Sequence, residues 1–184
     1  MDKETQILEA AMKLLIEHGT QGTPMSAIAR AANTGMGTIY NYFATKEELI
    51  NAIYLYVKRN QLHSVAEPAT DEPIKRRFDR YYTSLLQYLV AHPEQFRFMD
   101  HYQNAPVLTP TTRQQGLETI APVADLLAKG QQQGIVKEIG IDELLEFLNG
   151  GMMGVVRWVL NNDKPLTQTF LDSQARIAWD AIKQ

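Results

Sequence analysis

The 184-residue sequence contains no cysteine, and this absence excludes two kinds of stabilising site. Disulfide bonds and cysteine-ligated zinc both require thiols, so neither can support this fold. A chain without thiols suits a reducing compartment, and we expect a cytoplasmic protein. Helical metal sites place histidines three or four residues apart, and no two histidines have that spacing here. We therefore expect no metal and no cofactor; the histidines are His18, His63, His92 and His101.

Long apolar runs and catalytic constellations are also lacking. The most apolar late stretch, Gly150–Leu160, is short and contains Arg157, so we expect no transmembrane span and no membrane partner. The first residues, MDKETQ, are polar and do not have the pattern of a signal peptide. No serine is accompanied by a base at a recognisable position, and no glycine-rich stretch has the lysine of a phosphate-binding loop. We therefore do not expect an enzyme.

No run of the chain alternates apolar and polar residues as a β-strand does, and apolar residues recur three and four apart instead. This spacing predicts an all-α fold of about nine helices, with an N-terminal three-helix head and a second helical domain. We place the head at residues 1–48 and the second domain at 49–184, linked by a helix from about 45 to 65. A Pro-rich turn over 67–73 should follow that helix. Pro122 should bend or split a helix predicted over 111–133, because proline removes a backbone donor.

The stretch Pro24–Leu49 has the pattern of a helix-turn-helix. Apolar residues line one side of a first short helix, and Thr23 before the proline is expected to be its N-cap. Asn33-Thr34-Gly35 should end that helix, because Asn and Gly tolerate positive φ. A second short helix runs from about Met36 to Phe43, and Thr45–Glu48 has the pattern of a capping box for the third. This arrangement can place its second helix in a DNA major groove.

The residues Gly37–Phe43 (GTIYNYF), followed by Lys46–Leu49 (KEEL), resemble the recognition helix and the following helix start of the TetR (tetracycline-repressor-like) family. The resemblance covers about residues 4 to 50, and beyond residue 60 only the all-helical layout is similar. Four turn residues, Asn33 to Met36, depart from the usual family pattern. Asn33 can serve the turn in place of the usual glycine, so the departures bear on operator sequence and affinity rather than on the fold.

The resemblance implies a homodimeric transcriptional regulator that binds double-stranded operator DNA through this head. Lys46 and Tyr42 match family positions that contact phosphates, while Thr38, Tyr40 and Asn41 face the groove. The DNA-binding residues expected in this way are Met25, Ser26, Met36, Gly37, Thr38, Tyr40, Asn41, Tyr42 and Lys46. An alternative without DNA remains, in which Ile39, Tyr40 and Phe43 form one packed face; we expect Ile39 and Phe43 to be core in either case.

The charge of the chain argues mildly against nucleic acid. Net charge is −3, and residues 1–50 contain four Lys and Arg side chains against six Asp and Glu side chains. Phosphate binding usually requires a basic surface. Any phosphate contacts must therefore be local, made by Lys46 and by tyrosine and threonine hydroxyls.

Aromatic and methionine side chains are frequent between residues 78 and 158. In the family that this chain resembles, the corresponding domain encloses a small, often apolar or aromatic effector, and such residues suit a pocket of that kind. Each of them singly could equally be ordinary core. The candidate ligand-binding residues are Phe78, Tyr82, Tyr88, Phe96, Met99, Tyr102, Phe147 and Met152.

The helix over Ile141–Asn161 is apolar on nearly every side, so it must be covered on nearly every side. We predict that it and the last helix form a four-helix contact with a second copy across a two-fold axis, because reading a palindrome requires two heads. The alternative is that one subunit buries all of this apolar surface. The predicted interface consists of Leu144, Phe147, Leu148, Gly151, Val155, Trp158, Phe170, Ile177, Ala178 and Ala181.

These patterns together predict a ligand-responsive, DNA-binding transcriptional regulator. We expect a repressor that a small, mostly apolar ligand releases from a palindromic operator. Two alternatives come from other classes of protein. One is a helical protein–protein adaptor that uses the same fold without ligand-regulated transcription, and the other is an enzyme with an incidental helix-turn-helix.

Overall fold

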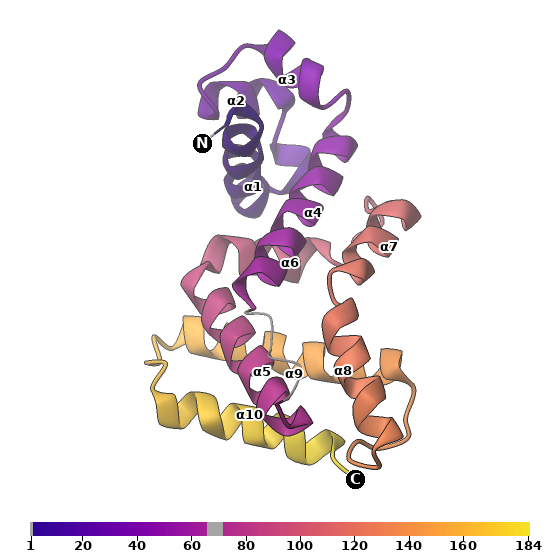
Figure 1. Ribbon diagram of the computed structural model, residues 1–184. Coiled ribbons are helices and arrows are strands. Elements are labelled where there is room, and N and C mark those ends of the chain that lie inside the picture. Colours follow the sequence, from indigo (N-terminus) through magenta and orange to yellow (C-terminus); the bar gives the residue numbers. More distant parts are fainter. Residues whose placement is uncertain (1, 66–71) are drawn as a thin grey trace. The chain divides into compact units, whose positions relative to one another are not determined.

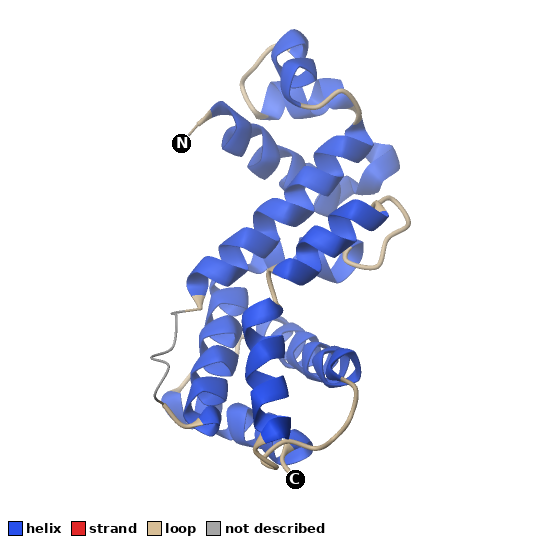
Figure 2. Cartoon of the chain, turned by 45° about the vertical axis from the view of Figure 1, so that its right-hand side comes forward, coloured by secondary structure: helices blue, strands red, loops and turns tan. Residues whose placement is uncertain are grey.

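The computed structural model describes residues 2–65 and 72–184, and within them the chain is helical (Figures 1 and 2). An isolated antiparallel bridge joins Val136 and Lys183. Most of the turn predicted over 67–73 lies outside the described residues. The helices are α1 (Lys3–Gly22), α2 (Met25–Ala31), α3 (Met36–Tyr42), α4 (Lys46–Ser64), α5 (Ile74–Ala91), α6 (Pro93–Tyr102), α7 (Pro110–Glu118), α8 (Ala121–Gln132), α9 (Ile141–Asn161) and α10 (Gln168–Ile182).

The all-α prediction is confirmed, but the described residues form ten helices rather than about nine. The difference arises at Pro122. The helix predicted over 111–133 is split into α7 and α8, and this proline occupies the first turn of α8. A proline is tolerated in a first turn because the N–H that it lacks would have no partner there. The predicted split is therefore confirmed, and it accounts for the extra helix.

The described residues form two compact units. The first comprises Met1–Asn60 and Pro93–Leu117, and the second comprises Gln61–His92 and Glu118–Gln184. The chain passes from one unit to the other three times, and the first passage lies inside α4. The functional boundary predicted after residue 48 concerns DNA-binding and ligand-binding roles, and it stays a prediction.

The first unit has a core of apolar side chains that α1 to α4 and α6 contribute. Asp2 caps α1 by accepting a hydrogen bond from the Thr5 amide at 2.8 Å, and this bond lowers the pKa of the Asp2 carboxyl. The regular part of α1 ends at Gly19, whose φ of 66° is the left-handed conformation expected of a glycine that stops a helix. The fully buried side chains of this unit include Ile7, Leu15, Ile28, Ile39, Leu49, Ile53 and Phe98.

The second unit packs α5 against α8, α9 and α10. Phe78 of α5 lies between two other rings, with centroids 5.9 Å from Tyr82 and 5.3 Å from Trp179. The C-terminus is fixed to the segment after α8, since Lys137 donates its amide to the Ile182 carbonyl at 2.9 Å. No helix in the described ranges is long and apolar enough to cross a membrane.

Candidate nucleic-acid interface

The turn between α2 and α3 forms as the sequence predicts. Asn33 has a φ of 47°, which asparagine tolerates better than most residues, and it follows Ala32, the C-cap of α2. The Thr34 amide donates to the Ala29 carbonyl at 2.9 Å and closes the turn. Gly35 then precedes the first residue of α3 with an extended backbone. A helix, a four-residue break and a second helix therefore occupy residues 25–42.

The two faces of α3 differ sharply in exposure. Ile39 is fully buried and Phe43, at the end of the helix, is 5% exposed, so the core roles predicted for both are confirmed. Tyr40 and Tyr42 are 50% and 47% exposed, and Asn41 between them is exposed too. The alternative in which Ile39, Tyr40 and Phe43 form one packed face is therefore wrong, because Tyr40 is exposed. The helix presents two hydroxyls and an amide to solvent.

The other predicted contact residues lie on the same two short helices. Ser26 and Gly37 are exposed, while Met25, Met36 and Thr38 are half-buried. The ranges of α2 and α3 contain a single charged side chain, the exposed Arg30. This surface therefore offers mainly neutral donors and acceptors.

The corner between α1 and α2 differs from the prediction at Thr23. This residue does not cap α2, whose N-cap position is Pro24. Its fully buried hydroxyl turns back instead and bonds to the carbonyls of Leu14 at 3.1 Å and Gly19 at 2.8 Å. The helix end at Gly19 leaves carbonyls in need of donors, and a buried hydroxyl satisfies them. The N-cap prediction was wrong because the Thr23 hydroxyl bonds to carbonyls of α1 and makes no capping bond to α2.

Of the two hydrogen bonds of the capping box predicted for α4, one forms as predicted and the other forms with a neighbouring residue. Thr45 accepts from the Glu48 amide at 3.1 Å, as a capping box requires. The Glu48 carboxylate accepts from Ala44, one residue earlier than the standard partner, at 2.8 Å. Lys46 directly follows Thr45, and its ammonium donates to the Thr20 carbonyl at 2.6 Å and to the Thr23 carbonyl at 3.2 Å. Lys46 is thus already engaged with backbone from α1.

Sequence reasoning missed how α6 and α7 join this unit. Asn51 of α4 is 8% exposed, donates to the Val107 carbonyl at 2.9 Å and accepts from the Thr109 amide at 2.9 Å. The Tyr102 hydroxyl of α6 lies 3.1 Å from the Thr20 hydroxyl. The signal available was Asn51 itself, a polar residue among the apolar positions of α4. Nothing in the sequence named its partners.

The eight candidate ligand residues do not form one group. Phe96, Met99 and Tyr102 belong to the first unit, and the other five belong to the second. Within the second unit, Phe78, Tyr82 and Met152 are buried, and burial raises the pKa of the Tyr82 hydroxyl. Tyr88 is half-buried and stacks on His92 with centroids 4.1 Å apart. Phe147 is 59% exposed, so it does not line an enclosed pocket.

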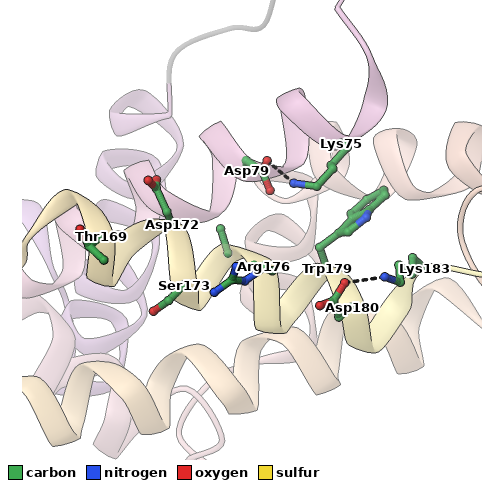
Figure 3. A pocket seen from close by; sticks show the side chains of 10 residues that line it. Lys75, Asp79, Thr169, Asp172, Ser173, Arg176, Trp179, Asp180 and Lys183 are labelled. Carbon is green, nitrogen blue, oxygen red and sulfur yellow. Dashed lines mark hydrogen bonds and ion pairs between the residues drawn. The ribbon is translucent and has the colours of Figure 1, made fainter.

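A cleft of about 530 Å³ lies in the second unit between α5 and α10 (Figure 3). Its walls are mostly charged and hydroxyl side chains, and Lys75–Asp79 and Lys183–Asp180 form ion pairs along it. Trp179 is its aromatic member, and none of the eight candidate ligand residues lines it. The polar side of α10 accounts for this composition. Among the described residues, no group of side chains is arranged to hold a metal ion.

The predicted dimer surface is partly exposed and partly covered within the chain. Leu144, Leu148 and Ala178 are buried in their own subunit, as are Met152 and Val156, which are apolar residues of α9 outside the predicted interface. The large exposed members are Phe147, Trp158 and Ile177, at 59%, 48% and 62%. Val155 and Gly151 lie with Phe147 and Ile177 around a shallow hollow of about 110 Å³ between α9 and α10. An apolar face therefore remains on these two helices.

Comparison with known proteins agrees with this architecture. A family model described as bacterial regulatory proteins, tetR family, matches residues 7–53, and one described as the tetracyclin repressor-like C-terminal domain matches residues 59–184. The chain is 33% identical over 95 residues to the HTH-type transcriptional regulator YhgD of Bacillus subtilis, covering 50% of this chain and 49% of that protein. The alignment thus spans about half of that relative.

Two longer matches cover most of the chain. The fatty acid metabolism regulator protein of Bacillus subtilis is 26% identical over 177 residues, covering 88% of this chain and 86% of that protein. The crystal structure of a tetR family transcription regulator from Shewanella sp. PV-4 has a TM-score of 0.92 at 24% identity, and the match covers 100% of both chains. At that identity the structural likeness establishes the fold.

Proposed function

This chain belongs to the TetR family of bacterial DNA-binding transcription regulators, and we propose that it acts as a repressor whose operator binding a small effector controls. The observation that supports DNA reading is the surface of α3. Its apolar side is buried in the head, and Tyr40, Asn41 and Tyr42 are exposed together on the other side. Side chains with these groups can donate to phosphate oxygens, and they can donate to or accept from base edges.

Asn41 is the side chain best suited to read a base. An asparagine amide can form a bidentate pair with adenine, and its loss should cost about 1–3 kcal/mol of discrimination at one position. The experiment is to select binding sequences from a random duplex pool with the wild-type protein, then repeat the selection with Asn41→Ala. We expect a partial palindrome for the wild type and a relaxed preference at one position of each half-site for the variant.

A control separates base reading from general weakening. Tyr42→Phe removes a hydroxyl that we assign to phosphate contact, so it should lower affinity for every sequence without changing the selected motif. An Asn41→Ala protein that selects the same motif as the wild type would remove Asn41 from base reading. A wild-type protein that enriches no sequence would remove the repressor function altogether.

We assign the two copies of the head to a homodimer formed through α9 and α10. A palindrome needs two heads about 34 Å apart, one turn of the double helix, and each chain has one head. The exposed apolar face around Val155 supports this assignment, because three large apolar side chains there are each at least 48% exposed. Contiguous exposed apolar surface of this kind is typical of protein interfaces.

The effector is proposed to be a small, mostly apolar molecule. Aromatic residues are plentiful in the C-terminal unit, and a relative that aligns over most of its length is named for regulating fatty acid metabolism. An effector shifts the equilibrium between operator-binding and released forms by no more than its differential affinity for them. Long-chain fatty acids are the first probes to test. The effector should both raise the melting temperature and weaken operator binding, and a compound that does only the first is not the effector.

A further inference from the structure

The corner between α1 and α2 contains backbone carbonyls that need donors from elsewhere. The last carbonyls of any helix lack partners within it, and here Gly19 ends the regular part of α1 before Thr20 and Thr23. The Thr23 hydroxyl shares its single hydrogen between the Gly19 and Leu14 carbonyls further back in α1. The carbonyls of Thr20 and Thr23 themselves accept from Lys46. These bonds fix the backbone that leads directly into α2.

The same ammonium belongs to the first residue of α4, just after α3. Lys46 lies 26 residues after Thr20 and 23 residues after Thr23. Its bonds therefore link the two ends of the segment that contains the whole helix-turn-helix. The chain segment that enters α2 and the segment that leaves α3 are tied to one another through a single side chain. A shift of either segment would move Ser26 of α2 or Tyr42 of α3.

We propose that Lys46 is a positioning residue, which fixes the helix-turn-helix by bonding to Thr20 and Thr23 and does not serve as a phosphate contact. This proposal rests on the DNA-binding function proposed above. It departs from the role that the family resemblance implies for this lysine. An ammonium has three N–H donors, and two of them are occupied here. The carbonyl end of α1 also favours a cation, because it is the negative end of the helix dipole.

Salt dependence distinguishes the two roles. A cation that neutralises a DNA phosphate releases counterions, so losing it reduces the slope of log affinity against log salt by about 0.9 per head. A cation that only positions its neighbours releases none. Removing it should weaken binding at every salt concentration and leave the slope unchanged. Arg30, exposed in the last turn of α2, provides the comparison, since it is the charged side chain of the two DNA-reading helices.

The experiment uses the full chain with Lys46→Met, Lys46→Gln and Arg30→Gln, titrated onto a mixed-sequence 30-base-pair duplex at several salt concentrations. We expect Lys46→Met to bind about tenfold more weakly throughout, equivalent to about 1.4 kcal/mol, with the wild-type slope. Lys46→Gln keeps amide donors without charge and should recover part of the affinity. Amides of residues 19–25 should exchange hydrogen faster in Lys46→Met. Arg30→Gln should lose about 0.9 of slope per head.

Each contrary outcome has a distinct meaning. A slope reduced by about 0.9 per head in both Lys46 variants would make Lys46 a phosphate contact and overturn the proposal. A lower melting temperature with wild-type affinity in both Lys46 variants would leave Lys46 a purely structural role and overturn it as well. If the wild-type chain bound neither this duplex nor any sequence from the random pool at any salt concentration, the DNA-binding function itself would fail, and the positioning role would fail with it.

Discussion

The buried polar side chains of the described residues, Thr23, Asn51, Gln95 and Thr112, all lie in the unit formed by Met1–Asn60 and Pro93–Leu117, whereas the core of the other unit centres on packed aromatic rings. Lys46, Asn51 and Thr23 each bond to carbonyls at least nine residues away in the sequence. In the second unit, Phe78 stacks on Tyr82 and packs against Trp179 with the two rings tilted.

The exposed surfaces of the two units also differ in polarity. The first unit exposes tyrosines, whose rings end in hydroxyls, and the second exposes Phe147, Trp158 and Ile177. A polar surface on a head fixed by hydrogen bonds suits recognition of a polar partner, because those bonds hold donors at set positions. An apolar face on an apolar core suits association with a second protein surface. The roles proposed above, DNA binding for the first unit and dimerisation for the second, follow this chemical difference between their surfaces.

The largest expected effect is on the apolar face. Val155→Asp should raise the dissociation constant of the dimer at least about a thousandfold, because an uncompensated buried charge costs about 3–5 kcal/mol and the two-fold axis introduces two. Sedimentation equilibrium at micromolar concentrations measures this directly. Asn149→Asp, an exposed position elsewhere on α9, places the same carboxylate on the same helix and should leave the dimer intact.

Two outcomes would contradict the interface. A wild-type chain that sediments as a monomer at micromolar concentration would remove the four-helix contact. A Val155→Asp protein that remains dimeric would place the contact on another surface. In either case the apolar face of α9 and α10 would lose the role that distinguishes the second unit.

The next largest effect concerns the hydrogen bonds of the first unit. Asn51→Leu keeps the branching at Cγ but leaves the Thr109 amide and the Val107 carbonyl without their partner. We expect a loss of about 3 kcal/mol in unfolding free energy, because each buried unsatisfied group costs about 1–3 kcal/mol. Urea unfolding gives the total, and hydrogen exchange at residues 103–110 should show that the loss is local.

The same substitution in the second unit provides the control. Asn162 donates to the Trp158 carbonyl at an exposed site, so Asn162→Leu should change stability by less than about 0.5 kcal/mol. Equal losses at Asn51 and Asn162 would show that the first unit does not depend on its buried hydrogen bonds more than the second does. The comparison between the units would then rest on their surfaces alone.

The smallest effect tests packing at two glycines. A Cβ added at Gly116 of α7 would lie 2.5 Å from the Tyr54 hydroxyl oxygen, so Gly116→Ala must displace a buried ring. We expect a destabilisation of about 2 kcal/mol, typical of overpacking. Gly150 of α9 has no atom within 4 Å of an added Cβ, and Gly150→Ala should stabilise the protein by about 0.5–1 kcal/mol. Thermal melts measured side by side should show opposite signs, and equal signs would contradict the packing at Tyr54.

Much of the fold was predictable because its causes are local. The spacing of apolar residues predicted helices, and α9 spans the residues predicted for it. The positive φ at Asn33 and the helix break at Pro122 follow from the covalent structure of one residue each. The buried side of α3 was predictable for the same reason, since Ile39 and Phe43 are four residues apart on one helix face.

The sequence by itself therefore determined the helices, the helix-turn-helix and the exposed side of α3, because propensity, capping and periodicity act within a few residues. Only the tertiary structure decided where long-range donors go. The Thr23 hydroxyl turned back to α1, the Lys46 ammonium bonded to that same corner, and Asn51 received partners more than fifty residues away. It also decided that Phe147 and Trp158 lie outside the core while Met152 and Val156 of the same helix lie within it. Burial depends on which helices pack against which face, and no local pattern contains that information.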